Sequence, residues 1–587
     1  MLASAHAPAG PRFAGHVNTV ISAGRVELVD VRQRALGEAR LRALWILGLF
    51  AAIALVALAR LVHLGIGEQL RRGDAIASAP RRGDIVDRNG VPLARAFPAY
   101  SLWFNPKAMG EGSALVKTPA EVAAALLRIF PDENYDRLVA RLASGKPGYL
   151  RRRILPEDAN RIHALGEPAL EFPREAERYY PQGSMAAHVL GYVDAAGHGQ
   201  VGMEQVFDRR LTEGSNRATA AVLSIDSRVQ GALEDELGRA MQMSAAKGAA
   251  GIVLDVDTGE VLALTSLPSF NPNLIDTGGA ANIFNRATNQ TYELGSVFKP
   301  ITMAAAIDSG VVTDLSKRYQ SNRPLTIDGR QIHDSHSFGA TLNIPEALIH
   351  SSNVVTGQVA DQLGAARLKA TMQALAFNER PYIELPARGF PSWPRGDSKG
   401  TWSRITTMTV SFGHGIRVTP LNLAQAYAAM VNGGVWRPAT LKRVEPGQIP
   451  AGRRIWKAST SARMRQLLRT IVQQGTGRSA NAPGFRVGGK TGTAEISMNG
   501  RYQRDLVVST FAAAFPMDHP RYVVLTLLDQ PKATAATSGQ RTAAYNAAPV
   551  VARVVPRIGP LLGIMPDATR DIDISDIAPL IASGEGE

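Results

Sequence analysis

The stretch ELGSVFKPITMAAAIDSG, residues 293–310, predicts a helix with two reactive side chains at its start. Pro300 is tolerated only in the first turn, so the helix must begin close to Ser296, and Gly310 ends it. Ser296 and Lys299 then share one face, because they lie three positions apart. A serine hydroxyl needs a base to become a good nucleophile, and a lysine can serve if burial or nearby positive charge lowers its pKa. The stretch therefore predicts Ser296 as nucleophile and Lys299 as its base.

The spacing alone is weak, because Ser244 and Lys247 repeat it just before a predicted strand. A second motif comes from HSSN, residues 350–353, where a serine can pass a proton and an asparagine amide can orient a lysine or a substrate amide. This motif predicts Ser351 and Asn353 as further catalytic residues. It too is weak alone, because Ser-x-Asn recurs elsewhere in the chain.

The third motif is VGGKTGT, residues 487–493, which contains the single Lys-Thr-Gly of the chain. Strand alternation places Thr491 and Thr493 on one face, where two hydroxyls can bind a carboxylate. Gly492 leaves room for a substrate backbone to lie against the strand. Lys490 points the other way in an ideal strand, so it must reach the cleft around an edge.

Alternating and apolar runs after residue 220 predict strands at both ends of a domain, with helices between them. This arrangement indicates an α+β fold. The predicted hairpin pairs residues 251–257 with 260–264, the later strands cover 510–515 and 522–528, and one of the helices covers 421–431. Residues 119–170 are predicted to be helical and carry no titratable cluster.

The apolar run that starts at Ala43 predicts one transmembrane helix over residues 43–64, with Arg60 reaching toward a headgroup. A cleavable signal peptide is the alternative, since Ala57-Leu-Ala59 resembles a cleavage site. The run is long for a signal core and follows a polar tail, so an uncleaved helix is favoured. Basic residues flank it almost equally, and therefore leave the orientation open.

The whole chain has 587 residues and no cysteine, which excludes disulfides, zinc–thiolate sites and a cysteine nucleophile. No metal or cofactor is expected. A formal charge of +14 fits nucleic acid, anionic lipid or an anionic polymer, but no nucleic-acid-binding motif is present. The acidic segment 561–587 is predicted to be a flexible tail.

The order Ser-x-x-Lys, Ser-x-Asn, Lys-Thr-Gly resembles that of penicillin-binding proteins and β-lactamases. Further stretches resemble the class B penicillin-binding proteins, the monofunctional peptidoglycan transpeptidases, and favour the cell-division type. They are RGDIVDRNG (82–90), RYYP (178–181), HVLGYV (188–193), GME (202–204) with Phe207-Asp208, IHD (332–334) and FGHGIRVTPL (412–421).

The resemblance implies a domain order as well as a fold. It implies a cytoplasmic tail (1–42), the transmembrane helix, an elongated pedestal or dimerisation domain (65–219) and a transpeptidase domain (220–560) with an antiparallel sheet flanked by helices. The pedestal motifs are expected to hold this domain against the catalytic one.

The resemblance also implies a mechanism. Ser296 attacks the penultimate D-alanine carbonyl of a stem peptide, and the N–H groups of Ser296 and Thr493 form the oxyanion hole. Ser351 and Lys299 relay a proton to the leaving D-alanine, and an amine from a neighbouring stem resolves the acyl-enzyme. β-Lactams acylate Ser296. The substrate carboxylate is expected to be bound by Lys490, Thr491 and Thr493, and the substrate backbone is expected to lie against Gly492.

Two missing features sharpen this expectation. The chain lacks the Glu-x-x-Leu-Asn segment with which class A β-lactamases activate water, so the acyl-enzyme is expected to be long-lived. It also lacks a glycosyltransferase signature, so a polytopic membrane glycosyltransferase and other division proteins are the implied partners. Peptidoglycan lies outside the inner membrane, which implies a periplasmic catalytic domain, at the division septum.

Two alternatives remain from the sequence. The first is a hydrolase, either a β-lactamase or a D,D-carboxypeptidase. The second is a non-catalytic receptor that binds β-lactams or stem peptides.

Overall fold

The computed structural model describes residues 18–22, 25–29, 44–58, 60, 82–107, 115–194, 196–213, 218–277, 282–498 and 501–581. Strands β1 (Asn18–Ser22) and β2 (Arg25–Val29) pair as an antiparallel hairpin. Residues 44–58 are helical, and the predicted transmembrane helix at 43–64 extends past the described residues at both ends. Among the described helices, none is both long enough and apolar enough to cross a membrane.

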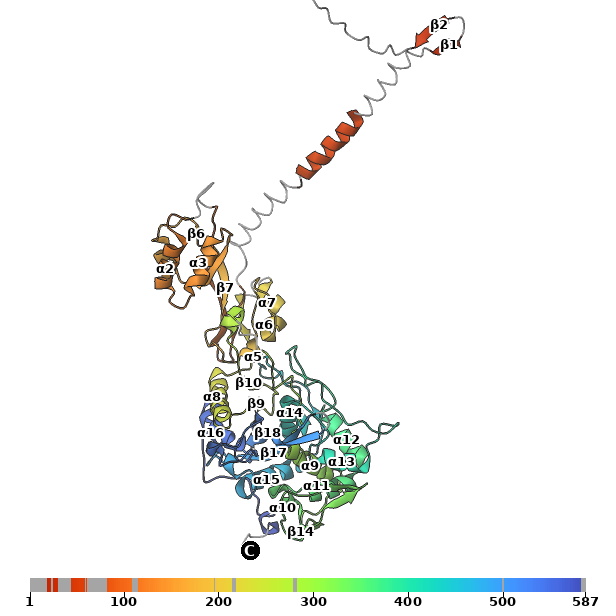
Figure 1. Ribbon diagram of the computed structural model, residues 1–587. Coiled ribbons are helices and arrows are strands. Elements are labelled where there is room, and N and C mark those ends of the chain that lie inside the picture. Colours follow the sequence, from red (N-terminus) through yellow and green to blue (C-terminus); the bar gives the residue numbers. More distant parts are fainter. Residues whose placement is uncertain are drawn as a thin grey trace, which may run out of the picture. The chain divides into compact units, whose positions relative to one another are not determined.

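A five-stranded antiparallel sheet lies at the centre of one of two compact units, which comprises Pro80–Ala99 and Ala176–Glu587 (Figure 1). Strands from both ends of the predicted domain meet in this sheet, so the prediction of an antiparallel α+β domain is confirmed. Its order is β10 (Val261–Leu267), β9 (Gly248–Asp255), β19 (Tyr522–Asp529), β18 (Arg501–Phe515) and β17 (Gly488–Met498).

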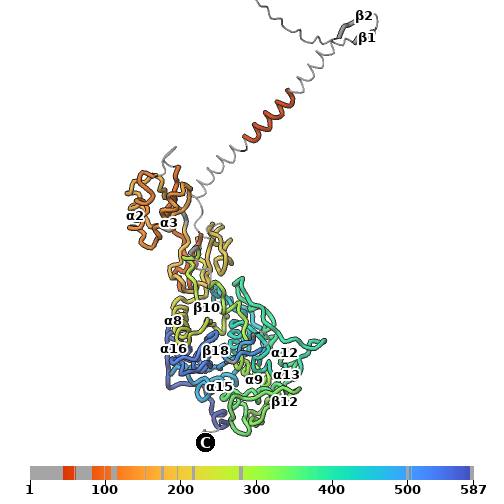
Figure 2. Tube along the Cα trace, in the orientation of Figure 1, coloured from red at the N-terminus to blue at the C-terminus, as the bar shows by residue number. Residues whose placement is uncertain are grey.

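Helices cover both faces of the sheet, which explains why β9 and β19 are almost continuously apolar. On one face α8 (Ser227–Met243) packs beside α16 (Ala548–Ile558), as Figure 2 also shows. On the other face lie α14 (Pro420–Val431) and the segment that carries Ser296. Alternate side chains of β9 therefore enter different cores: Val253 packs with the α8 side and Ile252 with the α14 side.

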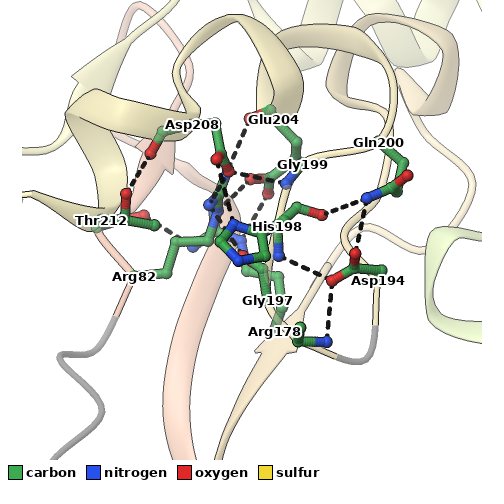
Figure 3. A network of polar contacts seen from close by, with 12 residues as sticks. Arg82, Arg178, Asp194, Gly197, His198, Gly199, Gln200, Glu204, Asp208 and Thr212 are labelled. Carbon is green, nitrogen blue, oxygen red and sulfur yellow. Dashed lines mark hydrogen bonds and ion pairs between the residues drawn. The ribbon is translucent and has the colours of Figure 1, made fainter.

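The three stretches that resemble pedestal motifs meet in one cluster of buried charges (Figure 3). Glu204 is 0% exposed and accepts hydrogen bonds of 2.6 Å from both Arg82 Nε and Arg178 Nε. Arg82 also pairs with Asp208 at 2.6 Å. The first stretch continues to the catalytic part, since Asp87 accepts from the Ser227 hydroxyl at the start of α8 at 2.7 Å. The whole cluster lies within this one compact unit, and the expectation that these motifs hold a pedestal domain against the catalytic one stays a prediction.

The other compact unit contains Tyr100–Glu175, so the predicted pedestal at 65–219 is divided between the two units. In this unit the outer part of β4 (Pro92–Phe104) pairs with β5 (Gly148–Ile154) and β6 (Leu170–Glu171). The all-helical prediction for 119–170 is therefore wrong at β5, because its partner strand lies far back in the sequence. The remaining elements are α2 (Pro119–Ile129), α3 (Tyr135–Ala143) and α4 (Pro156–His163).

The C-terminal segment corrects a second prediction. Residues 561–581 are folded onto the catalytic part instead of forming a flexible tail. Ile577 is 0% exposed within the main core, and Asp571 forms a two-pronged ion pair with Arg469 on α15 (Ala458–Gln474). Asp576 likewise pairs with Arg463 on α15, and these two ion pairs help to explain why a charged sequence is ordered here.

Candidate active site

Ser296 lies in a short 3-10 turn, η4 (Gly295–Phe298), which leads directly into α9 (Lys299–Asp308). Pro300 occupies the first turn of α9, as predicted. Ser296 is half-buried, while Lys299 is 0% exposed. The helix thus starts at the reactive pair and carries the lysine into the core.

Close backbone contacts set the distance between Ser296 and the Lys-Thr-Gly strand. Gly295 has φ +62°, and a Cβ there would lie 2.8 Å from the Thr493 carbonyl oxygen. A Cβ at Gly492 would lie 2.3 Å from the Leu294 carbonyl oxygen. Gly492 was predicted to leave room for substrate, but its missing side chain makes room for the nucleophile segment itself. The N–H groups of Ser296 and Thr493 belong to these two segments, and their role as an oxyanion hole stays a prediction.

Ser351 is the point at which the three motifs converge. Its hydroxyl accepts from Lys299 Nζ and from Lys490 Nζ, each at 3.0 Å, and Lys299 also donates to the Ser351 carbonyl. Ser351 has φ +61°, the left-handed region that a non-glycine residue seldom adopts. In the described part of the chain, no hydrogen bond joins Lys299 directly to Ser296. The predicted base therefore contacts the second motif rather than the nucleophile.

Both lysines are buried without a carboxylate in ion-pair contact among the described residues. Burial lowers the pKa of Lys299 to about 7, and the negative charge of Asp334 opposes that change. Burial, together with the positive charge of Lys299, also lowers the pKa of Lys490 well below its ordinary value. A neutral amine next to a serine hydroxyl at neutral pH is a competent general base.

Asp334 holds the second motif in place, a role that the sequence did not reveal. Its carboxylate accepts from the Ser352 hydroxyl at 2.6 Å and from the Val354 N–H at 3.1 Å, at the start of α11 (Asn353–Leu363). The Asn353 side-chain amide donates to the His333 carbonyl at 3.1 Å. The Ser-x-Asn motif is thus hydrogen-bonded to the Ile332–Asp334 stretch. In the sequence, this stretch served only to indicate the cell-division type.

Thr476, at the end of α15, is the other residue that the sequence missed. Its hydroxyl lies 2.8 Å from Thr491 Oγ1 and 3.4 Å from Lys490 Nζ. Lys490 also donates to Thr491 Oγ1 at 3.2 Å, so the buried amine of this lysine lies beside the Thr491 and Ser351 hydroxyls. Thr493 Oγ1 accepts from the Ala543 N–H at 3.0 Å and keeps its own proton available to donate. One sequence feature could have pointed to Thr476: it stands between two glycines directly after a long predicted helix.

The stretch Phe412–Gly415 lies against the same site. A Cβ at Gly413 would come within 2.3 Å of the Gly295 carbonyl oxygen. Burial and the charge of Lys299 lower the pKa of His414. By contrast, Ser244 ends helix α8 and donates to the Ala240 carbonyl at 2.7 Å. The rival Ser-x-x-Lys is therefore a structural helix end, and Ser296 with Lys299 stays the predicted reactive pair.

Two protein-family models match the chain. The model described as penicillin binding protein transpeptidase domain matches residues 249–553, and the model described as penicillin-binding protein dimerisation domain matches residues 77–224.

Among curated proteins, the chain is 39% identical over 495 residues to a probable peptidoglycan D,D-transpeptidase FtsI of Caulobacter vibrioides, covering 82% of each chain. It is 30% identical over 532 residues to peptidoglycan D,D-transpeptidase FtsI of Escherichia coli, covering 86% of this chain and 87% of that protein. Among solved structures, it is similar to penicillin-binding protein 3 of Mycobacterium tuberculosis complexed with aztreonam. That match has a TM-score of 0.65 at 25% identity and covers 84% of this chain and 99% of the other.

Proposed function

The chain belongs to the class B penicillin-binding proteins, and from this premise we propose that it is the peptidoglycan D,D-transpeptidase of septal wall synthesis and a target of β-lactams. The relatives named FtsI support the transpeptidase activity and the septal role. The related structure with bound aztreonam supports the sensitivity to β-lactams.

The observation that carries this proposal is the pair of buried lysines on one hydroxyl. Lys299 and Lys490 both donate to Ser351 Oγ at 3.0 Å, and burial lowers the pKa of Lys299 to about 7. A neutral Lys299 removes the proton of Ser296 as the hydroxyl attacks the carbonyl of the penultimate D-alanine. Ser351 passes that proton to the nitrogen of the leaving D-alanine. The acyl-enzyme is then attacked by an amine of a second stem peptide, which closes the cross-link and frees Ser296.

The remaining predicted site residues hold the substrate. The N–H groups of Ser296 and Thr493 stabilise the oxyanion, and Asn353 orients a substrate amide. The substrate carboxylate is bound by hydrogen bonds from Lys490, Thr491 and Thr493, while Gly492 keeps this strand close to the nucleophile.

The experiment that tests the proposal is labelling with a fluorescent penicillin. The wild-type chain should form a stable covalent adduct that maps to Ser296, and the Ser296→Ala variant should form none. An adduct on Ser244, or an undiminished adduct on Ser296→Ala, would overturn the assignment.

Two further measurements separate the alternatives. With a model D-Ala-D-Ala ester and an added amine, a transpeptidase gives mainly the amide product, whereas a hydrolase gives mainly the free acid. Growth supported by Ser296→Ala in place of the wild-type chain would indicate a receptor.

The location is also part of the proposal. We place the catalytic part in the periplasm, held at the inner membrane by a helix within residues 43–64. A polytopic membrane glycosyltransferase would supply the glycan strands. Attachment to membranes that survives a high-salt wash, and protease access to the catalytic part only from the periplasmic side, would support this placement.

A further inference from the structure

The folded C-terminal segment, residues 566–581, lies against three parts of the chain that each lead to a residue of the candidate site. We call this segment the C-terminal strap. It contains four acidic residues, and its neighbours present arginines. Asp571 contacts α15, Leu580 contacts the start of α10 (Ile344–Ile349), and Asp567 contacts the lead-in to β17.

The contact with α15 is the strongest. Asp571 accepts from Arg469 Nε at 2.9 Å and from Arg469 Nη2 at 2.6 Å, and Gln473 adds a third donor at 3.1 Å. The remaining nitrogen of Arg469 donates to the carbonyl of Val487, three residues before Lys490, at 2.8 Å. Because a two-pronged pair fixes the plane of a guanidinium, Asp571 fixes where Arg469 holds Val487.

The same helix ends at the catalytic groups. Thr476 follows α15 and shares a hydrogen bond of 2.8 Å with Thr491. Its N–H donates to the Ile349 carbonyl at 3.3 Å, and Ile349 lies two residues before Ser351. A shift of α15 would therefore move Thr476, Lys490 and Ser351 relative to one another.

The far end of the strap reaches the second motif. The Asn343 side chain, which caps α10, donates to the Leu580 carbonyl, and α10 leads to Ser351. Between the two ends, Ile577 is fully buried in the main core, and Arg463 pairs with Asp576. The strap thus contacts α10, which leads to Ser351, and α15, which packs beside the strand that carries Lys490.

We propose that the C-terminal strap is a positioning element for acylation, and that Asp571 is the positioning residue that sets the Thr476–Lys490–Ser351 geometry through Arg469. This inference rests on the proposed transpeptidase function. Asp571 touches neither substrate nor the reacting atoms, so it acts only through the elements that it holds.

The test compares Asp571→Ala with Asp573→Ala in the full-length chain. Asp573 lies in the same strap, but its carboxylate is exposed, and among the described contacts it accepts only from the nearby Ser575. The acylation rate constant with fluorescent penicillin is measured from pH 5 to pH 9 in both variants, together with their thermal unfolding. Since small misplacements of catalytic groups cost one to two orders of magnitude, Asp571→Ala should acylate about tenfold more slowly than the control.

Two readouts distinguish positioning from plain stability. In Asp571→Ala, the acid limb of the rate profile should move to higher pH, because a looser site admits water around Lys299. Asp571→Glu, which can still pair with Arg469, should recover much of the rate.

The proposal is overturned if Asp571→Ala matches Asp573→Ala in rate and pH profile, or if its rate falls only in proportion to the unfolded fraction. Failure of the wild-type chain to label at Ser296 would instead overturn the proposed function, and the strap inference with it.

Discussion

Two clusters of buried positive charge lie in one compact unit and differ in how each charge is balanced. Around Glu204, two arginines share one buried carboxylate, and Asp208 adds a second (Figure 3). Around Ser351, two fully buried lysines share only a hydroxyl. A balanced charge stays charged and joins segments of the chain, whereas an unbalanced lysine gives up its proton more readily and becomes a base. Burial alone therefore does not distinguish a structural cation from a catalytic one.

Replacing Lys299 by methionine should give the largest effect. The acylation rate with fluorescent penicillin should fall about a thousandfold, because the general base is lost. Thermal stability should stay the same or rise, since an unpaired buried amine is removed. Lys247→Met, at an exposed lysine of the rival motif, is the control and should acylate normally. Acylation that survives in Lys299→Met would assign the base to another group.

Replacing Glu204 by glutamine tests the balanced cluster. It leaves Arg178 and Arg82 buried beside a neutral side chain, which should cost about 3 kcal/mol of unfolding free energy. Urea unfolding measures this loss, and Glu213→Gln, at an exposed glutamate, serves as the control. The fraction that remains folded should acylate at the wild-type rate. A variant as stable as the wild type would mean that the cluster does not join the motifs.

The pH dependence of the wild-type chain tests the unbalanced cluster. Burial lowers the pKa of Lys299 from its ordinary range to about 7, so the neutral base is present above that pH and lost as the pH falls. In the fraction of molecules that stays folded, the acylation rate should therefore decline about tenfold for each unit below pH 7. A rate that stays flat down to pH 5 would contradict the role of Lys299.

The smallest effect is expected at Asp334. Its charge opposes the lowering of the Lys299 pKa, so Asp334→Asn should move the acid limb of the rate profile to lower pH. The variant should also lose about 1 kcal/mol of stability. The reason is that a neutral amide accepts weaker hydrogen bonds from the Ser352 hydroxyl and the Val354 N–H than the carboxylate does. Asp361→Asn, at a surface pair with Arg404, is a matched control. A shift to higher pH would contradict the assigned direction.

Local sequence patterns predicted those features that depend on neighbouring residues. The start of the helix at Ser296 followed from Pro300, and the sheet followed from apolar runs bounded by turns. The convergence of the three distant motifs was expected from the resemblance to penicillin-binding proteins, and not from local patterns. Contacts between distant, unremarkable segments could not be predicted in this way. Thr476 contacts Lys490 only because α15 packs beside β17. Asp571 contacts Arg469 only because the C-terminal segment packs against α15.

The same limit explains the errors. An acidic C-terminal run is typical of a solvated segment, and nothing within the run shows that arginines of α15 will face it. A strand such as β5 depends on a partner that lies far back in the sequence. Gly492 was assigned to the substrate because a strand edge was considered without the nucleophile segment that packs against it.

The three close backbone contacts at Gly295, Gly413 and Gly492 constrain how this protein can change under selection by drugs. Even one methyl group at any of them would overlap a carbonyl oxygen, at distances of 2.8, 2.3 and 2.3 Å. Variants at these positions would displace the nucleophile from natural peptides and antibiotics alike. Escape from β-lactams that preserves wall synthesis should therefore arise at side chains around the cleft, and these glycines should stay fixed in resistant lineages.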